Sequence, residues 1–409
     1  MMPMNNYVRL ALRNIFRHRA RSAATLAAIA IGVASLILAG GFIQDIYIQL
    51  GEAIIHSQTG HIQVTQQGYS KGKRRAPEKY LIENLGELEN QLKINPAIKQ
   101  VSTRLSFSGT LNNGRRDLGI VGEGIEANIE RDIGTHIHFV EGRGLSDSDS
   151  SGIIVGQGVA KNLGLSVGDH VTVLATLPQG AVNTMDFEVI GVFQSFSRDF
   201  DARAVRITLQ AAQSLMDTKA AHLLIVMLDE TRATDATTTQ LKQMLAGKGF
   251  EVTSWKALSD FYEKTVDLYD RQFGVLRLII LIMVILSVAN SVNMTLFERT
   301  REFGTMLALG ERTSGVFRLI VTESLCLGLL GSSLGMLLGC LSGVAISAIG
   351  IPMPPPPNAN LGYMALIRLD AISVLAAGTI GFLACVLAAF TPARRASRLD
   401  IGEALRHGV

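Results

Sequence analysis

Four apolar runs divide the chain, and each is long enough to cross a membrane as a helix. They occupy residues 22–42, 273–296, 315–349 and 371–390. A bilayer core needs roughly 20 apolar residues in helical conformation. We therefore expect a membrane α-helical fold with four transmembrane helices. The third run is apolar throughout only from residue 325, so its first part is expected to extend on the cytoplasmic side.

The stretch between the first two runs, residues 43–271, has a different pattern. Its ends repeat apolar residues at helical spacing and lead into the flanking runs, so residues 43–55 and 256–271 are expected to form two stalk helices. The rest alternates apolar and polar positions between turn residues, which is typical of strands mixed with short helices. We expect a large extracytoplasmic α+β domain of two lobes, the second inserted at about residues 141–222.

Individual elements of this domain can be placed by periodicity. Strand patterns occur at residues 61–65, 101–110, 118–122, 152–156, 171–175, 187–194, 223–228 and 250–254, and helical patterns at 85–93, 157–163 and 236–246. The strands at 171–175 and 187–194 are expected to pair. The last three elements are expected to return the chain to the first lobe.

Basic residues set the expected orientation. Five arginines precede the first run, and others follow the second and fourth runs, as is typical of cytoplasmic segments. This bias predicts a cytoplasmic amphipathic helix at residues 1–21, a cytoplasmic segment at 297–314, an outer loop at 350–370 and a cytoplasmic tail at 391–409. A cleaved signal peptide is the alternative for the N-terminus, but the first run exceeds the about 7 to 15 apolar residues of such signals.

Composition agrees with a membrane protein that carries a domain. Hydrophobic residues make up 48% of the chain, more than is usual for a soluble enzyme, although its centre is polar. Pro352 and Pro354–Pro357 favour an extended polyproline turn in the outer loop. The cysteines Cys326, Cys340 and Cys385 all lie in apolar runs, so no disulfide is expected.

The charged insert between the second and third runs is the strongest candidate functional segment. Read as a helix, Phe297, Arg301 and Gly304 follow one face, whereas Glu298, Arg299, Glu302 and Thr305 follow others. Such an amphipathic segment can lie at the membrane surface and contact a partner. Local charge pairing in a solvated turn is the simpler alternative.

Several segments resemble one family of transporters. ERTREFGTMLALG at residues 298–310, followed by an apolar helix, resembles the coupling segment of FtsX-like permeases, the MacB/LolC/LolE superfamily of ABC transporters. TPARRASRLDIGEAL at 391–405 is similar to the C-terminal signature of that superfamily, and residues 10–34 resemble its N-terminus. GHIQVTQQGY at 60–69 and residues 152–173 look like the LolC/LolE branch. The resemblance covers nearly the whole chain.

The resemblance implies a permease subunit that responds to a motor. The partners it implies are a pair of cytosolic ABC ATPase subunits that bind ATP and magnesium, a second copy or a related permease, membrane lipids and, depending on the branch, a lipoprotein carrier or a periplasmic adaptor; no nucleic acid is implied. It also implies a bacterial inner-membrane location with both termini cytoplasmic. The ATPase-coupling residues would be Phe297, Glu298, Arg299, Thr300, Arg301, Glu302, Phe303, Gly304, Met306, Leu309 and Gly310.

The resemblance leaves the cargo open. In the LolC/LolE branch the cargo would be lipoproteins or other lipid-linked molecules, and in the MacB branch peptides or drugs. An FtsX-like protein would instead signal to a cell-wall hydrolase. A membrane-anchored binding module without a motor is a further alternative, against which the coupling and C-terminal signatures argue.

Two features of the third run carry packing predictions. Gly331, Gly335, Gly339 and Gly343 recur every fourth residue and form a GxxxG ladder for close helix packing. The partner helix can belong to the same chain or to another subunit. Glu323 near the cytoplasmic start needs a cation, for which Arg318 or Arg312 is the expected partner.

The sequence offers little catalytic chemistry. It contains no G-x-x-x-x-G-K-[ST] motif, so ATP and magnesium are expected on a separate ATPase and no cofactor on this chain. His136 and His138 would share a face of a strand but form too weak a set for a metal site. No nucleophile and base can be paired, so we expect neither catalytic nor metal residues.

Overall fold

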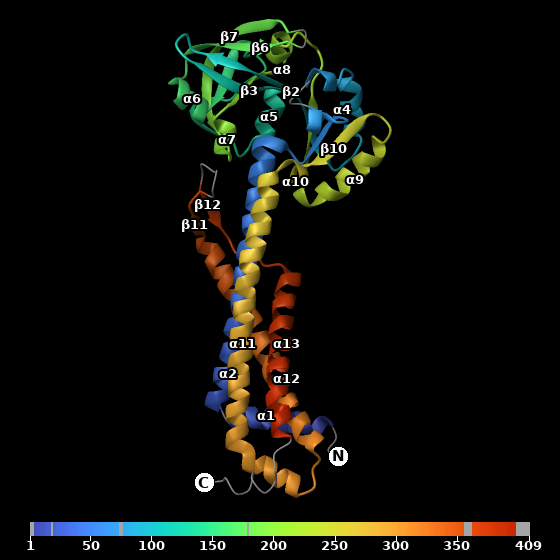
Figure 1. The fold of residues 1–409 in the computed structure, drawn as a ribbon, viewed down its shortest axis with the longest axis vertical. Coiled ribbons are helices and arrows are strands. Elements are labelled where there is room, and N and C mark those ends of the chain that lie inside the picture. Colours follow the sequence, from blue (N-terminus) through green and yellow to red (C-terminus); the bar gives the residue numbers. More distant parts are fainter. Residues whose placement is uncertain (1–3, 18, 73–76, 178–179, 356–361, 398–409) are drawn as a thin grey trace. The chain divides into compact units, whose positions relative to one another are not determined.

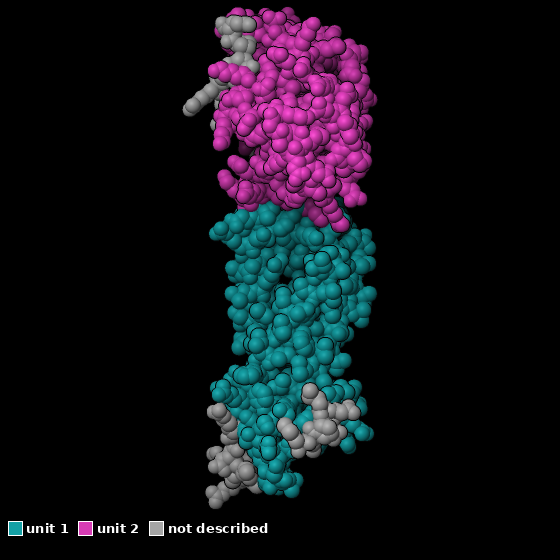
Figure 2. All heavy atoms as spheres, turned by 90° about the vertical axis from the view of Figure 1, so that its right-hand side faces the viewer, with its two compact units in different colours: residues 1–47, 266–352, 364–409 teal, residues 48–265, 353–363 magenta. Residues whose placement is uncertain are grey.

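The computed structural model describes residues 4–17, 19–72, 77–177, 180–355 and 362–397. It divides into two compact units, coloured separately in Figure 2. Unit 1 comprises residues 1–47, 266–352 and 364–409, and unit 2 comprises residues 48–265 and 353–363. The helices α2 and α11 each contribute to both units.

Unit 1 is helical. Its elements are α1 (Met4–Arg17), α2 (Arg19–Ile54), α11 (Asp260–Ala308), α12 (Thr313–Ile349) and α13 (Ala371–Ala396), shown in Figure 1. Among the described residues, four helices are long and apolar enough to cross a membrane, namely α2 with the turn that follows it, α11, α12 and α13. The predicted membrane fold with four spans is thus confirmed. The last helix is longer than the predicted run 371–390, because α13 continues to Ala396. Residues 398–409 of the predicted tail lie outside the described part.

Small residues bring the helices of unit 1 together. A Cβ atom at Gly331 would lie 2.9 Å from the Ile29 side chain, and one at Gly335 would lie 2.8 Å from the Ala30 carbonyl oxygen. Gly339 faces Ile37 in the same way. Three of the four glycines therefore pack against α2 of the same chain. The fourth, Gly343, faces the side chains of Ile367 and Leu369.

The outer loop forms a small sheet. β11 (Ile351–Met353) pairs with β12 (Tyr363–Ala365), where the sequence predicted an extended proline turn. Pro356 and Pro357 lie outside the described residues. After β12, the backbone amide of Leu366 and the guanidinium of Arg368 both donate to the fully buried carboxylate of Asp45, at 2.8 Å each. The loop is thereby tied to α2.

Unit 2 is built on one ten-stranded sheet with the order β10-β1-β9-β2-β3-β8-β5-β7-β4, and β6 pairs with β2 and β7. The strands are β1 (Ile62–Gln66), β2 (Ile98–Asn112), β3 (Asp117–Ile125), β4 (His138–Gly142), β5 (Gly152–Gly156), β6 (His170–Thr176), β7 (Val182–Gln194), β8 (Ala204–Thr208), β9 (Leu223–Leu228) and β10 (Phe250–Ser254). The predicted pairing of β6 with β7 is confirmed, and the two strands run antiparallel.

Short helices cover this sheet (Figure 1). They are α3 (Tyr69–Gly72), α4 (Leu85–Lys93), α5 (Ala127–Ile133), α6 (Gln157–Leu163), α7 (Arg198–Asp201), α8 (Leu209–Leu215), α9 (Thr234–Met244) and α10 (Trp255–Leu258), with a π-helical turn η1 (Ile55–Thr59) and 3-10 turns η2 (Pro77–Tyr80) and η3 (Thr231–Ala233).

Two separate cores define the two lobes. One gathers Ile62 and Val226 with α4 and α9, and the other gathers Ile153 and Phe187 with α6 and α8. The second core also contains Leu105 on β2, so the predicted start of the second lobe near residue 141 is too late. The long strand β2 passes from one core into the other, and periodicity alone does not reveal such a shared strand.

The two stalk segments differ from each other. Residues 43–54 are part of α2, but the predicted second stalk at 256–271 is not one helix. α10 ends at Leu258, Ser259 adopts a non-helical conformation, and α11 begins at Asp260. Within unit 1, the hydroxyl of Tyr47 donates to Asp270 at 2.8 Å and to the carbonyl of Val266 at 3.3 Å, which joins α2 to α11.

Candidate functional site

The predicted coupling segment is the C-terminal end of α11 and the turn that follows. The amide of Glu311 donates to the Met306 carbonyl and that of Gly310 donates to the Leu307 carbonyl, both at 3.0 Å. Gly310 has φ +92°, which favours glycine. This is the Schellman arrangement, in which the chain satisfies the last carbonyls of a helix by itself. α12 then begins at Thr313.

One face of the segment is buried, and it is not the predicted one. Leu296, Arg299, Phe303 and Gly304 are buried, whereas Phe297 is 79% exposed. The sequence placed Arg299 on a polar face and grouped Phe297 with Gly304. The difference arises because Arg299 pairs with Glu323, which is only 12% exposed, and this pairing changes the face on which a charge is stable.

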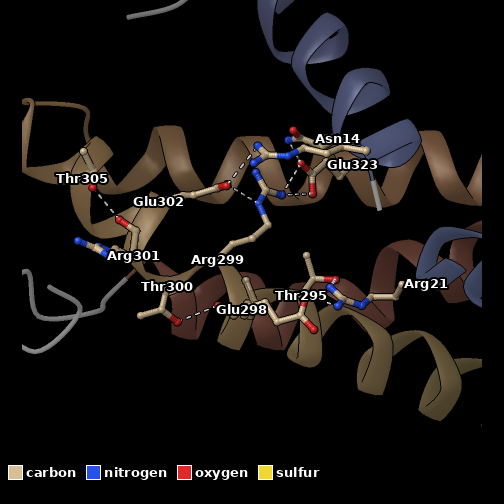
Figure 3. Close-up of polar contacts among 12 residues, drawn as sticks. Asn14, Arg21, Thr295, Glu298, Arg299, Thr300, Arg301, Glu302, Thr305 and Glu323 are labelled. Carbon is tan, nitrogen blue, oxygen red and sulfur yellow. Dashed lines mark hydrogen bonds and ion pairs between the residues drawn. The ribbon is translucent and has the colours of Figure 1, made fainter. Parts of the chain in front are cut away.

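Arg299 joins α11 to α12. Its Nη1 donates to both carboxylate oxygens of Glu323, at 2.9 and 3.1 Å, and its Nε donates to Glu302 at 2.8 Å (Figure 3). The guanidinium also lies 5.0 Å from the centre of the Phe303 ring. The expectation that Arg318 or Arg312 would pair with Glu323 is therefore wrong, and Arg299 takes that place.

The first helix and the start of α2 bind the same region. The side-chain amide of Asn14 donates to the Glu323 carboxylate, and the Tyr7 hydroxyl donates to the Glu311 carboxylate at 3.1 Å. Arg17 pairs with Glu302 at 3.4 Å, and Arg21 pairs with Glu298. These contacts and the Arg299 pair form what we call the cytoplasmic network, after the side of the membrane on which the sequence predicts it. They connect the end of α11 to α1, α2 and α12.

Four residues of the segment remain exposed along one side. Phe297, Arg301, Thr305 and Leu309 follow one another at four-residue steps, and all four are exposed. Leu309 is 84% exposed at the tip of the turn. In Figure 3 the side chain of Arg301 points away from Arg299 and Glu323. We call these four residues the exposed stripe. Of the other predicted coupling residues, Glu298, Glu302 and Gly310 are also exposed, and Thr300 and Met306 are partly buried.

The sequence contained one unused signal for the network. Arg299 and Glu323 each lie twelve positions from Glu311, on opposite sides of the turn. In a helical hairpin, positions equally distant from the turn lie at similar heights, so this spacing would have selected Arg299 over Arg318. Asn14, Arg17 and Tyr7 had no such signal, because α1 lies far away in sequence.

The histidines considered for metal binding are not a pair. His136 stacks on His56, with ring centres 5.5 Å apart, whereas His138 lies on the exposed edge strand β4. Within the described part of the chain, no group of three or more metal-ligating side chains is found.

Known families match most of the chain. Residues 22–244 match the family of the MacB-like periplasmic core domain, and residues 274–401 match the FtsX-like permease C-terminal family. The second match contains the end of α11, the turn and both residues of the Arg299–Glu323 pair.

Individual relatives agree with these families. An uncharacterized ABC transporter permease of Methanocaldococcus jannaschii is 23% identical over 65% of this chain and 65% of its own length. The lipoprotein-releasing system transmembrane protein LolC of Neisseria meningitidis is 24% identical over 94% of this chain and 93% of its own length. The macrolide export ATP-binding/permease protein MacB of a Shewanella species is 25% identical over 97% of this chain but only 60% of its own length.

A solved structure has also been matched. It is the periplasmic region of MacB from Actinobacillus actinomycetemcomitans, with 17% identity, a TM-score of 0.38, and coverage of 52% of this chain and 95% of that one. The match to the periplasmic core domain alone, residues 22–244, takes in more than half of the 409 residues. The chain therefore belongs to the ABC transporter permeases that join a MacB-like periplasmic core domain to an FtsX-like permease C-terminal domain.

Proposed function

We propose that this chain is the permease subunit of an ABC transporter in the inner membrane, driven by a separate pair of cytosolic ATPase subunits. The observation that carries the proposal is the exposed stripe on a helix end that the cytoplasmic network fixes to three other helices. ATP and magnesium bind the ATPase. The permease contributes a docking surface, four spans and a periplasmic unit.

The cytoplasmic network can transmit a displacement of α11 to the neighbouring helices. A partner that contacts Phe297 or Leu309 acts on α11, and Arg299 and Arg21 pass the displacement to α12 and α2. Arg299 is buried and bonded to two carboxylates, so the helices cannot separate without exposing unpaired charges. Motion of α11 alone is therefore less favourable than motion of the group.

The cargo we propose is lipoproteins or other lipid-linked molecules of the outer leaflet. Support comes from the relative named as part of a lipoprotein-releasing system, which aligns over nearly the full length of both chains. Such cargo starts in the membrane, so movement of the periplasmic unit suffices and no channel is needed. Two copies, or this chain and a related permease, would surround it.

Export of macrolides or similar molecules is the second candidate. It is favoured by the MacB relative, which aligns over 97% of this chain. A fluorescent lipopeptide and a macrolide, each offered to the reconstituted complex, distinguish the two cargo classes by which one stimulates ATP hydrolysis.

The docking proposal is tested by truncating the stripe. Phe297→Ala and Leu309→Ala should reduce both the amount of ATPase that copurifies in mild detergent and its stimulated hydrolysis, because each removes apolar area from the interface. The copurified chain is identified by mass spectrometry and must carry a nucleotide-binding loop.

Leu286→Ala is the matched control, since Leu286 is also exposed on α11 but lies within the apolar run. This control should leave ATPase binding unchanged. Equal ATPase yield and turnover in all three variants would contradict docking at the stripe.

A further inference from the structure

The outer end of α2 is held by two buried arginines. The last carbonyls of a helix lack intrahelical partners and carry partial negative charge. After α2 the chain forms the turn η1, where Arg206 Nη2 donates to the Ser57 carbonyl at 3.2 Å and Arg104 Nη1 donates to the Gln58 carbonyl at 2.7 Å. The side chain of Arg104 is only 3% exposed, and that of Arg206 only 2%.

Two carboxylates balance these arginines. Glu130 accepts from Nε and Nη2 of Arg104, at 2.6 Å each, and Glu123 accepts from Nε of Arg206 at 2.9 Å. Ser102 donates to Glu130 at 2.9 Å. We call Arg104, Arg206, Glu123, Glu130 and the carbonyls of Ser57 and Gln58 the helix-end joint. It contains two positive and two negative side chains, so no net charge is buried.

Arg206 and Glu123 come from the part of the sheet that forms the second lobe, whereas Arg104 lies where β2 passes from one core into the other and Glu130 lies on a helix beside it. Arg104 lies on β2, Glu123 on β3, Arg206 on β8 and Glu130 on α5. The turn has another tie to the same helix, because His56 Nδ1 lies 3.0 Å from the Ile133 carbonyl oxygen at the end of α5.

The first lobe holds α2 in another way. A Cβ atom at Gly51 would lie 2.8 Å from the Trp255 ring, so the indole packs directly on the helix backbone. The hydroxyl of Thr231 donates to Glu52 at 2.6 Å. The joint is thus the charged link from the helix end to the second lobe, and it lies entirely within unit 2.

If the joint only stabilised the fold, its guanidinium groups would not each need two kinds of acceptor. A buried ion pair alone often contributes little to stability relative to apolar residues of similar size. Here each guanidinium divides its donors between a carboxylate and a carbonyl of the turn, and for Arg206 that carboxylate belongs to the second lobe. This division adds a charged link to the other contacts of the turn, which are the His56 contact and the packing of Ile55 with Ile133. It suits Arg because a planar fork of donors can serve two acceptors at once.

We propose that Arg104 and Arg206 are positioning residues that make the second lobe follow displacements of the outer end of α2. The proposal rests on the proposed function, in which an ATPase displaces the membrane helices. Without the joint, α2 would still move, and the second lobe would no longer follow it.

The test uses the full chain reconstituted with its ATPase, after Cys326, Cys340 and Cys385 have been replaced. Spin labels at Lys161 on α6 and Lys242 on α9, both exposed, report the distance between the lobes with and without ATP. A second label pair at Leu276 and Leu341, both exposed on the membrane helices, reports motion in unit 1. The parent protein should show nucleotide-dependent shifts with both pairs.

The key variant is Arg206→Met with Glu123→Gln, which removes a cation and its counter-charge together. It should abolish the shift between Lys161 and Lys242 while the shift in unit 1 and ATP hydrolysis persist. Arg206→Lys is the milder variant, because a single ammonium can stay beside Glu123 but cannot also hold the Ser57 carbonyl as a guanidinium does. It should reduce the shift between the lobes.

The outcomes separate the two proposals. A parent protein without a shift in either label pair contradicts the proposed function. A parental shift between the lobes in both folded variants overturns the joint alone. Loss of the folded unit in both variants also overturns it, because the joint would then serve folding only.

Discussion

The C-terminal ends of α2 and α11 are stabilised in opposite ways. α2 continues into the turn η1, whose carbonyls Arg104 and Arg206 satisfy from other parts of the fold. α11 ends in a Schellman turn at Gly310, which satisfies its carbonyls within the chain. The carbonyls of the first end are thus satisfied by a domain, whereas those of the second are satisfied by its own turn, which leaves the stripe exposed. We infer that one end receives a contact within the chain and the other offers a contact to a partner.

The two ends should lie on opposite sides of the membrane, and this is the largest effect to test. Single cysteines at Ser70 in unit 2 and Ser314 beside the turn, both exposed, should react oppositely with an impermeant reagent in intact spheroplasts. Ser70→Cys should label before lysis and Ser314→Cys only afterwards. Labelling of both before lysis would contradict the topology. The native cysteines are replaced first.

Removal of one arginine should weaken the α2 end more than the α11 end. Arg104→Met leaves the carboxylate of Glu130, which is 4% exposed, without its cation. It should lower the free energy of unfolding by about 3–5 kcal/mol. Arg299→Met removes the partner of Glu323, which is 12% exposed, and of Glu302, which is more exposed. The free energy of unfolding should therefore fall less than in Arg104→Met. Thermal unfolding in detergent measures both.

Arg301→Met is the matched control for these two variants, because Arg301 is exposed and belongs to the stripe. Its stability should change by no more than about 0.5 kcal/mol. A loss for Arg301→Met as large as that for Arg299→Met would mean that the described burial is wrong.

The Schellman turn predicts that alanine substitutions at two glycines, one in the turn after α11 and one within α11, change the stability in opposite directions. Gly310→Ala should destabilise by about 1 kcal/mol, since only its positive φ is unfavourable and no atom lies nearby. Gly274→Ala, within α11 and also in open space, should instead be neutral or stabilising by about 0.5–1 kcal/mol. Equal effects in unfolding experiments would argue against the turn.

The smallest expected effect is a pH dependence at the α2 end. His56 lies in unit 2, beyond the apolar run, and faces Glu52 on α2, His61 before β1, His136 after α5 and Lys99 on β2. The hydrogen bond to Glu52 raises the His56 pKa above 6.5, burial opposes this, and the Ile133 carbonyl adds to the rise.

The sign follows from the raised pKa. The stability contributed by the imidazolium is complete below pH 6.5 and is lost as the pH rises through the higher folded pKa. His61 acts in another range, because burial lowers its pKa to about 4 and its effect lies on the acid side of 6.5. Unfolding temperatures above pH 6.5 should therefore fall in the parent protein and fall less in His56→Gln. Parallel pH curves would contradict this assignment.

The sequence predicted local elements well. The helices Leu85–Lys93 and Gln157–Leu163 and the strands Gly152–Gly156, Leu223–Leu228 and Phe250–Ser254 coincide with the predicted ranges. Each is defined by its own pattern of apolar residues and bounded by turn residues.

The sequence failed where a charge is buried. The strand β8 was missed because Arg206 interrupts its short apolar run, and it is stable only because Glu123 lies on the neighbouring strand. Arg299 was assigned to a polar face for the same reason. The partner of a buried charge lies far away in sequence, so periodicity places the charge in solvent. Both ends compared above depend on such residues, which is why the site was less predictable than the fold.

Site-specific photo-crosslinking tests most directly whether the exposed stripe contacts the ATPase. A benzophenone amino acid placed at Leu309 should form a covalent adduct with the ATPase in the assembled complex, because this side chain is 84% exposed at the tip of the turn. The same probe at Met283, 64% exposed on α11 within the apolar run, should form none. An adduct at Met283 and none at Leu309 would contradict docking of the ATPase at the stripe.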